Sequence, residues 1–530
     1  MGAGAALKRD RATPVRVAIA TLGALLTLTA WLYASPPGSS PDDGYHLGSI
    51  WCAGGFVEGR CLEAIGSADP DVAIAPTVLP SLTCVAGDGR ESAKCQNDIY
   101  ARYEGQLSRT VANISGVRAG LYYRTANLLV TDDISASIAR IRVMNASLAL
   151  LLVGLTALIA APDVRRAVLL TWLVASLPLG VFLVTSLNST AWGLAGLGTL
   201  WANVITAVRP GERWRRGAAA ALALTGGIMA LGSRTEAAAH LAVIAAALLV
   251  LVATDLGWTR RPQWSRRGVA IAAGGTALLL GGLVAVGRFA AYDYLLGSFS
   301  GLGAGWERLV QRGISNPVLT LAVETPQLWT GALGTWSLGW LDTNMPSTVS
   351  VSATVAFVTL VAFGLAGASR GRVAAAAIIL AGMVALPVIS LLSEGLVVLE
   401  QLQPRHYIPL LYAFLGLALV RSRTEAPVLI GRGMGFVIAS ILSVGHSVAL
   451  IVNIRRYTTG LTEFLYIDAN REVEWWWGGL APSPEQVWLL GTVGYAAAAF
   501  IVLGLITRRS SRAVTDEAAT SGASVPAAQP

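Results

Sequence analysis

The sequence predicts an all-α protein that crosses a membrane many times and carries long loops on the outer side. Hydrophobic residues make up 54% of the 530 residues and charged residues only 13%, against about 45–50% and about 25% in soluble proteins. Apolar segments of about 17–25 residues, the length of a membrane-spanning helix, recur along the chain. Basic residues gather in alternate short connections, as the positive-inside rule requires.

We expect about twelve membrane-spanning helices. The first follows Lys8, Arg9 and Arg11 as a signal peptide does, but "ASPPGSS" after it offers no A-x-A-like cleavage site, so we expect a retained helix. The predicted spans are 17–34, 143–161, 167–186, 191–208, 217–232, 237–254, 268–287, 349–367, 373–392, 407–420, 434–453 and 488–506.

The basic loops place both termini in the cytoplasm. The expected organisation is a cytoplasmic N-terminus (1–16), a membrane domain (17–506) and a disordered cytoplasmic tail (507–530). The net charge of +8 follows from this topology and does not indicate a nucleic-acid partner. Three extracytoplasmic loops are expected, at 35–142, 288–348 and 454–487. Within the second, 316–334 is apolar, and we expect an interfacial or re-entrant segment there.

All four cysteines lie in the first extracytoplasmic loop, where an oxidising compartment would let them pair. Three connectivities are possible, and we favour Cys52 with Cys61 and Cys84 with Cys95. A metal site is the alternative, but no histidine stands at zinc-finger spacing.

Polar and charged residues cluster at the outer ends of the predicted spans, where they are costly and mark a substrate path or site. Asp42 and Asp43 follow the first span, and one could act as general base, or the two could hold a divalent cation. An Asp-Asp-Gly turn that only starts the loop is the alternative. His46 could orient a carboxylate or bind a phosphate, or be a plain surface histidine.

"QPRHYIP" puts Arg405 at the level of lipid phosphates, which a guanidinium binds through two parallel hydrogen bonds. An arginine that snorkels beside an aromatic belt is the alternative. Gln403 and Tyr407 flank it. The aromatic belt also explains "VEWWWGG" (473–479) better than sugar stacking does. Six further residues are expected to support the site: Arg124, Asn188, Arg234, Glu236, Trp340 and Asp342.

Six segments in order resemble a large bacterial family of multi-pass membrane proteins of unknown function: "SPDDGYHLGSIWC", "GLYYRTANLL", "LVTSLNSTAWG", "LGWLDTNMP", "LQPRHYIPLL" and "IRRYTTG". Members carry Pro-Asp-Glu-x-x-His, Asn-Pro, Gly-Trp-Leu-Asp and Gln-Gly-Arg-Tyr elements. Here Asp43 stands in place of Glu and Ser189 in place of Pro, and one residue is inserted before Tyr407. Arg405 is the counterpart of the family arginine.

That family is similar in layout to the GT-C glycosyltransferases, in which an acidic residue of the first outer loop faces a polyprenyl-phosphate sugar donor. The resemblance implies that Asp42 or Asp43 is the base and that Arg405 holds the donor phosphate, with Arg124 or Arg234 assisting. The resemblance implies a protein of the bacterial plasma membrane, in contact with membrane lipids, that transfers a sugar with inversion to a cell-envelope glycan or lipid. It implies no particular cofactor. A transporter or lipid flippase, or a non-catalytic envelope scaffold, are the alternatives.

Overall fold

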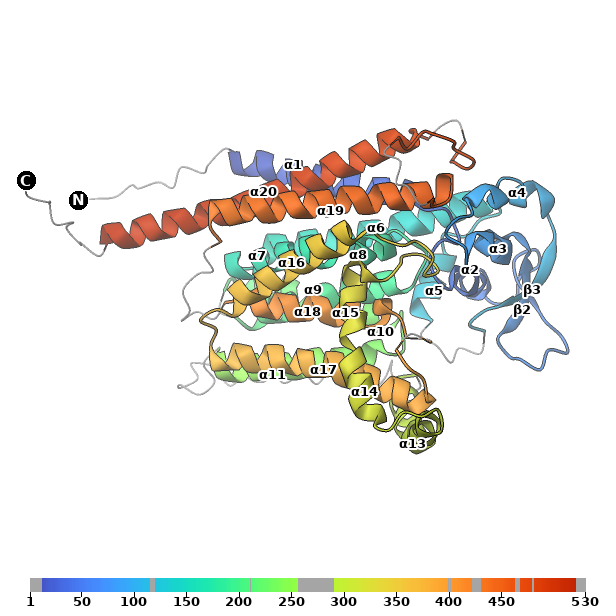
Figure 1. Cartoon of the computed structure of the whole chain (residues 1–530), viewed down its shortest axis with the longest axis horizontal. Helices are drawn as coiled ribbons and strands as arrows, with labels where there is room; N and C mark the ends of the chain where they lie inside the picture. The colour runs from blue at the N-terminus through green and yellow to red at the C-terminus, as the bar shows by residue number, and fades with distance from the viewer. Residues whose placement is uncertain are drawn as a thin grey trace, which may run out of the picture.

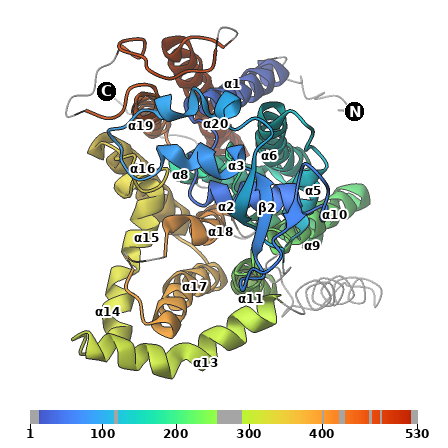
Figure 2. The ribbon, with the colours of Figure 1, turned by 90° about the vertical axis from the view of Figure 1, so that its right-hand side faces the viewer.

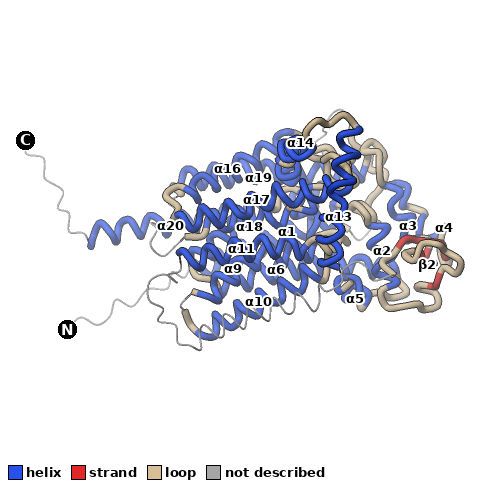
Figure 3. The backbone as a smooth tube through the Cα atoms, turned by 90° about the horizontal axis from the view of Figure 1, so that it is seen from below, coloured by secondary structure: helices blue, strands red, loops and turns tan. Residues whose placement is uncertain are grey.

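The computed structural model consists of a bundle of long helices with a small mixed domain at one end (Figure 1). Within the described residues, strands occur only in that domain (Figure 3). The structure describes residues 12–114, 120–209, 211–255, 290–398, 400, 402–421, 430–462, 468–478 and 481–520.

Eight of the described helices are long and apolar enough to cross a membrane. Each coincides with one of the predicted spans, so the multi-pass architecture is confirmed, whereas the count of about twelve is not. The eight are α1 (Ala12–Ala34), α6 (Ile134–Ile159), α9 (Thr190–Val208), α11 (Ala237–Asp255), α16 (Ser347–Leu365), α17 (Arg370–Glu394), α19 (Arg432–Thr458) and α20 (Pro484–Thr520).

The remaining predicted spans differ from a continuous apolar helix for local reasons. The span at 167–186 is split into α7 (Pro162–Ala175) and α8 (Leu179–Val184), because Pro178 cannot donate a helical hydrogen bond. The helix α10 (Arg213–Leu231) begins with charged residues. The helix α18 (Ile408–Leu419) has 12 residues, about 18 Å, against a hydrocarbon thickness of about 30 Å. The span at 268–287 lies outside the described residues.

The core of the bundle is formed by α9 and α18, which are apolar around nearly their whole circumference and almost fully buried. Packing between α9 and α18 is close where Gly416 meets the ring of Trp201, because a Cβ at Gly416 would lie 2.3 Å from that ring. Helix α1 lies along α20, and α20 also packs against α19. These three helices lie at the edge of the bundle opposite α11 (Figure 1). Helices from the two ends of the sequence are therefore neighbours in the bundle.

The small domain follows α1 and contains a three-stranded antiparallel sheet in the order β1-β2-β3. Two disulfides join Cys52 to Cys61 and Cys84 to Cys95, which confirms the expected pairing. The elements of the domain are α2 (Asp43–Cys52), β1 (Leu62–Glu63), β2 (Val72–Pro76), α3 (Val78–Ser81), η1 (Leu82–Val85), η2 (Ala93–Gln96), α4 (Ile99–Arg102), β3 (Leu107–Val111) and α5 (Leu121–Asn127).

Residues of the predicted second loop form one long helix and several short helical pieces along one side of the bundle, and Figure 2 shows them running around its edge. They are α13 (Ala290–Gln311), α14 (Pro317–Glu324), α15 (Pro326–Thr330) and the π-helical turn η3 (Gly331–Thr335). The apolar segment at 316–334 forms three consecutive helical pieces, with a turn at Thr325 before Pro326 and a kink at Gly334, where φ is 101°. Its interfacial or re-entrant placement stays a prediction.

The beginning of α1 and the end of α20 lie at the end of the bundle opposite the small domain (Figure 1). This arrangement agrees with an even number of membrane crossings from the start of α1 to the end of α20. The assignment of the small domain to the outer side of the membrane rests on the basic loops and stays a prediction.

Candidate functional site

The chain leaves α1 and enters α2 through a tight turn that separates the two adjacent aspartates. Asp42 has φ 63° and ψ 14°, in the left-handed region that a non-glycine residue seldom occupies. Gly38 in the same turn has φ 79°, and a Cβ there would lie 2.2 Å from the carbonyl oxygen of Leu82. The turn therefore has little freedom, and it sends the two carboxylates to different partners.

Asp43 is buried, with 2% of its surface exposed, at the first residue of α2. Its Oδ2 accepts a hydrogen bond of 3.1 Å from the backbone N–H of Ser40, whereas Oδ1 has no hydrogen-bond partner in the described chain. Burial raises the pKa of Asp43 to about 7, against the opposing effects of the Ser40 N–H and the charge of Arg142. Asp43 is therefore a carboxyl group that can exchange a proton near neutral pH.

Asp42 instead forms an ion pair with Arg405, on the turn η4 (Pro404–His406), with 2.6 Å between Oδ2 and Nη2. The Arg405 side chain is only 6% exposed and that of Asp42 is 51% exposed, so solvent reaches the pair from the side of Asp42. Nε and Nη1 of Arg405 are buried and have no hydrogen-bond partner in the described chain. A buried guanidinium with unused donors is a site for an anion with several acceptor oxygens.

A second ion pair, Arg234 with Glu236, lies beside the first one. Arg234 also donates to the Thr190 hydroxyl at 2.9 Å, and its charge is felt by both Arg405 and His406. Burial opposes ionisation of Glu236, but the charge of Arg234, assisted by those of His406 and His240 and by a backbone hydrogen bond, lowers the pKa of Glu236 to about 2. The loop before α11, the start of α9 and η4 thus meet at one charged cluster.

Three predicted residues hold the Gly38–His46 segment in place rather than facing a ligand. Asn188, fully buried, donates through Nδ2 to the carbonyl oxygen of Pro41 at 3.1 Å. Trp340 donates through Nε1 to the carbonyl oxygen of Gly38 at 2.8 Å. His46 is buried, and its Nδ1 lies 2.9 Å from the Tyr123 hydroxyl, so it is not a surface histidine.

Asp342 lies in a separate ion pair with Arg456, and both side chains are buried. Its Oδ2 accepts from Arg456 Nη2 at 2.8 Å and from the backbone N–H of Gly87 at 3.2 Å. Arg456 also donates to the carbonyl oxygens of Val85 and Glu91. This pair fastens the small domain to α19.

We expect Asp342→Ala to lower the free energy of unfolding by about 3–5 kcal/mol, because it leaves a buried guanidinium without its counter-ion. Thermal unfolding of the purified protein measures this loss, with Asp98→Ala, an exposed carboxylate that makes no side-chain cap, as the control. Unchanged thermal stability together with lost activity would show instead that Asp342 acts in the site.

The other predicted residues have differing surroundings. Gln403 lines a cavity of about 20 Å³ next to Arg405, which holds about one water. Tyr407 is buried, with its ring edge against His240 at a centroid distance of 5.5 Å. Arg124 is exposed at the end of α5 and makes no ion pair with any described residue. The structure therefore does not bring Arg124 into the charged cluster.

Sequence analysis missed Arg142, which the structure places inside α6 and buries. It donates from Nε to the carbonyl oxygen of Thr185 and from Nη2 to that of Leu32, and its charge acts on Asp43. The sequence contained an indication of this position, because Arg142 directly precedes the apolar run and a helix can begin before its apolar run does.

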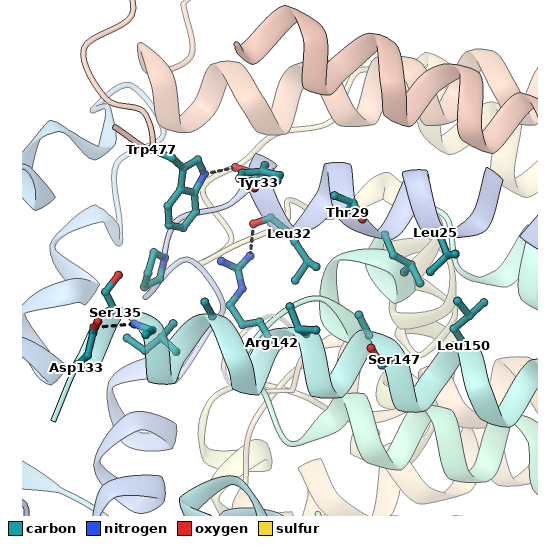
Figure 4. A pocket seen from close by; sticks show the side chains of 17 residues that line it. Leu25, Thr29, Leu32, Tyr33, Asp133, Ser135, Arg142, Ser147, Leu150 and Trp477 are labelled. Carbon is teal, nitrogen blue, oxygen red and sulfur yellow. Dashed lines mark hydrogen bonds between the residues drawn. The ribbon is translucent and has the colours of Figure 1, made fainter. Parts of the chain in front are cut away.

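Arg142 also lines a groove of about 580 Å³ between α1 and α6 (Figure 4). Trp477 closes one end of this groove, where its Nε1 donates to the carbonyl oxygen of Tyr33 at 2.7 Å. Most of the wall is apolar, as the side chains of Leu25, Leu32 and Leu150 in Figure 4 illustrate. The groove thus runs along two membrane-spanning helices, with the buried Arg142 between its two ends.

No group of three or more histidine, cysteine, aspartate or glutamate side chains in the described residues is placed to hold a metal ion. Asp42 and Asp43 have the separate partners given above, so the divalent cation considered for them would need ligands beyond these two carboxylates.

Comparison with known proteins adds a family but no activity. The family model described as "Predicted membrane protein (DUF2142)" matches residues 25–414, which include Asp42, Asp43 and Arg405. No curated protein and no solved structure matches the chain.

Proposed function

Because the chain belongs to the DUF2142 family of predicted membrane proteins, whose function is unknown, we propose an activity from the site itself. We propose that the protein transfers a sugar from a polyprenyl-phosphate donor to a cell-envelope glycan or lipid on the outer face of the membrane. The observation that carries the proposal is that Asp43, a buried carboxyl with its pKa raised to about 7, lies near Arg405, a buried arginine that is paired with Asp42 and has unused donors.

In the proposed reaction an acceptor hydroxyl gives its proton to Asp43 while its oxygen attacks the anomeric carbon of the donor sugar. The bond from that carbon to the phosphate oxygen breaks, and polyprenyl phosphate leaves with the electron pair. The configuration at the anomeric carbon is inverted, because no protein nucleophile takes part. A base works best when its pKa lies near the operating pH, which favours Asp43 over the ion-paired Asp42.

Arg405 would bind the donor phosphate and stabilise the charge that develops on it as the bond breaks. Its Nη2 is held by Asp42, and Nε and Nη1 remain for phosphate oxygens. Asp42 is then a positioning residue for Arg405.

The groove between α1 and α6 supports a donor with a lipid tail, because a long apolar chain in the bilayer can lie against its apolar walls. Arg142, midway along the groove, carries a charge that acts on Asp43. A water-soluble nucleotide-sugar donor would have no use for a groove that opens between membrane-spanning helices.

The distribution of ionisable residues favours an enzyme over a transporter. A transporter is expected to place such residues near the middle of several spans. In the described parts of the eight apolar helices most charged residues and histidines lie toward the helix ends, and the two exceptions have partners within the protein. Arg142 in α6 donates to the carbonyl oxygens of Thr185 and Leu32. His446 is buried, accepts from Trp31 Nε1 at 3.0 Å and stacks on Tyr495.

The proposal is tested with purified protein in lipid nanodiscs, a panel of radiolabelled polyprenyl-phosphate sugars and a cell-envelope extract as acceptor. Label is expected to enter the extract with the wild type and with the Asp98→Asn control, and not with Asp43→Asn. The absence of transfer from every donor, under conditions that support a known enzyme of this class, would reject the proposal. Uptake of the same donors into sealed vesicles would then favour the flippase.

A further inference from the structure

We propose that a cavity in the small domain binds a saccharide chain. Its description as the acceptor site rests on the proposed function, whereas saccharide binding itself does not. The cavity has a volume of about 690 Å³, within the range of about 300–1,000 Å³ that ligand pockets occupy. It lies where the end of α2, the Cys52–Cys61 loop and α4 meet the start of α6.

Three aromatic side chains contribute to the wall of this cavity: Trp51, Tyr100 and Tyr103. Trp51 is almost fully buried at the end of α2, so the two partly buried tyrosines at α4 provide the ring surface that a ligand can reach. Aromatic faces pack against the C–H faces of sugar rings, and the tyrosine hydroxyls supply polar edges. Rigid side chains of this kind bind a ligand with little loss of conformational entropy.

Planar polar groups surround the aromatic residues. Glu58, Glu104 and Gln106 are exposed at the cavity, and Gln106 donates from Nε2 to the carbonyl oxygen of Arg102 at 2.9 Å, which leaves its side-chain oxygen as an acceptor. Carboxylate and amide groups are suited to pairs of neighbouring hydroxyls, since they present two polar atoms in one plane. The cavity therefore combines stacking surfaces with hydrogen-bonding groups for hydroxyls.

A neutral saccharide fits the charges of the cavity better than a basic peptide does. Asp132 is paired with Arg60 at 3.2 Å, and Asp133 accepts the N–H of Ala136 as the cap of α6. Two of the four carboxylates therefore already have partners, which weakens the attraction of this wall for a basic peptide.

The position of the cavity relates it to the candidate site. Trp51 and Asp43 lie near opposite ends of α2, which separates them by about 12 Å along the helix axis. Asp133 and Ser135 at the start of α6 line both this cavity and the groove between α1 and α6. A bound chain of several sugars can thus extend from the cavity toward Asp43, whereas a single sugar cannot occupy both places.

The test measures the equilibrium binding of neutral linear oligosaccharides of one to six hexose or pentose units to the full chain in nanodiscs. Saturation-transfer NMR and calorimetry detect the binding. At least one series is expected to bind, with affinity that rises with length and hardly changes with salt. Tyr103→Ala should weaken binding at least tenfold, Tyr103→Phe should retain most of it, and Phe56→Ala, an exposed aromatic in the same loop region outside the cavity, should leave it unchanged.

Two results would overturn the proposal: no binding of any series, or binding that Tyr103→Ala leaves unaltered. Salt-sensitive binding of a basic peptide that Glu104→Gln abolishes would also overturn it, because it would identify a cationic ligand.

Failure of the proposed function gives a different result, since sugar transfer would then be absent while Tyr103-dependent binding persists. Conversely, transfer to acceptors of every length with unchanged KM in Tyr103→Ala would preserve the function and reject this cavity as the acceptor site.

Discussion

Asp43→Asn is expected to abolish sugar transfer and, at pH 8, to raise the thermal stability of the protein. The first effect follows because asparagine cannot take a proton from the acceptor hydroxyl. The second follows because the wild-type carboxyl, with a pKa raised by burial to about 7, must be ionised at pH 8 in a buried place. Ionising it there, instead of in water where the pKa of an aspartate is 3.8, costs about 4 kcal/mol. Asparagine keeps the hydrogen bond from Ser40 without carrying charge.

The pH dependence of the stability difference between the wild type and Asp43→Asn provides a control. Between pH 4 and 7 the folded protein keeps the Asp43 proton that the unfolded chain has lost, so wild-type stability falls as pH rises through this window and levels off above about pH 7. The advantage of Asp43→Asn in Tm is therefore expected at pH 8 and should vanish near pH 4, while Asp98→Asn shows no such pattern. Wild-type transfer is expected to increase with pH through about 7. A variant that is inactive and also less stable at pH 8 would contradict this assignment.

Arg405→Ala is expected to lower kcat/KM for the donor by about a hundredfold or more, mainly through KM. Removal of one partner of a buried, hydrogen-bonded charge pair typically costs about 2–5 kcal/mol. The loss combines the donor phosphate contacts with the uncompensated charge of Asp42. Steady-state kinetics against donor concentration at saturating acceptor measure the split between KM and kcat.

Two further variants separate the roles of the pair. Arg405→Lys retains the charge but loses the planar set of donors, so it should restore little of the affinity. Asp42→Asn releases Arg405 Nη2 while keeping the side-chain shape, and its effect should be smaller than that of Arg405→Ala, since Asp42 only positions Arg405. Wild-type donor KM in Arg405→Ala would remove Arg405 from the phosphate site.

Several features of the chain were predictable from the sequence because they depend on local patterns. Apolar runs predicted the eight long helices, and short spacing predicted the disulfide between Cys84 and Cys95. The break at Pro178 was also readable, since proline has no N–H to donate, although we expected one continuous span there. Arg142 was misplaced because a helix end can extend beyond its apolar run, and only burial of the arginine shows that it did.

The sequence alone determined that the chain is a multi-pass membrane protein and which polar residues follow its apolar segments. Tertiary structure decided how those residues are paired: Asp42 with Arg405, 363 positions apart, and Asp342 with Arg456. It also decided that Asp43 is buried and Arg124 exposed, although both lie beside apolar segments. The physical reason is that hydropathy and helical spacing act over a few turns, whereas an ion pair and the pKa of a buried carboxyl depend on which distant helices pack together.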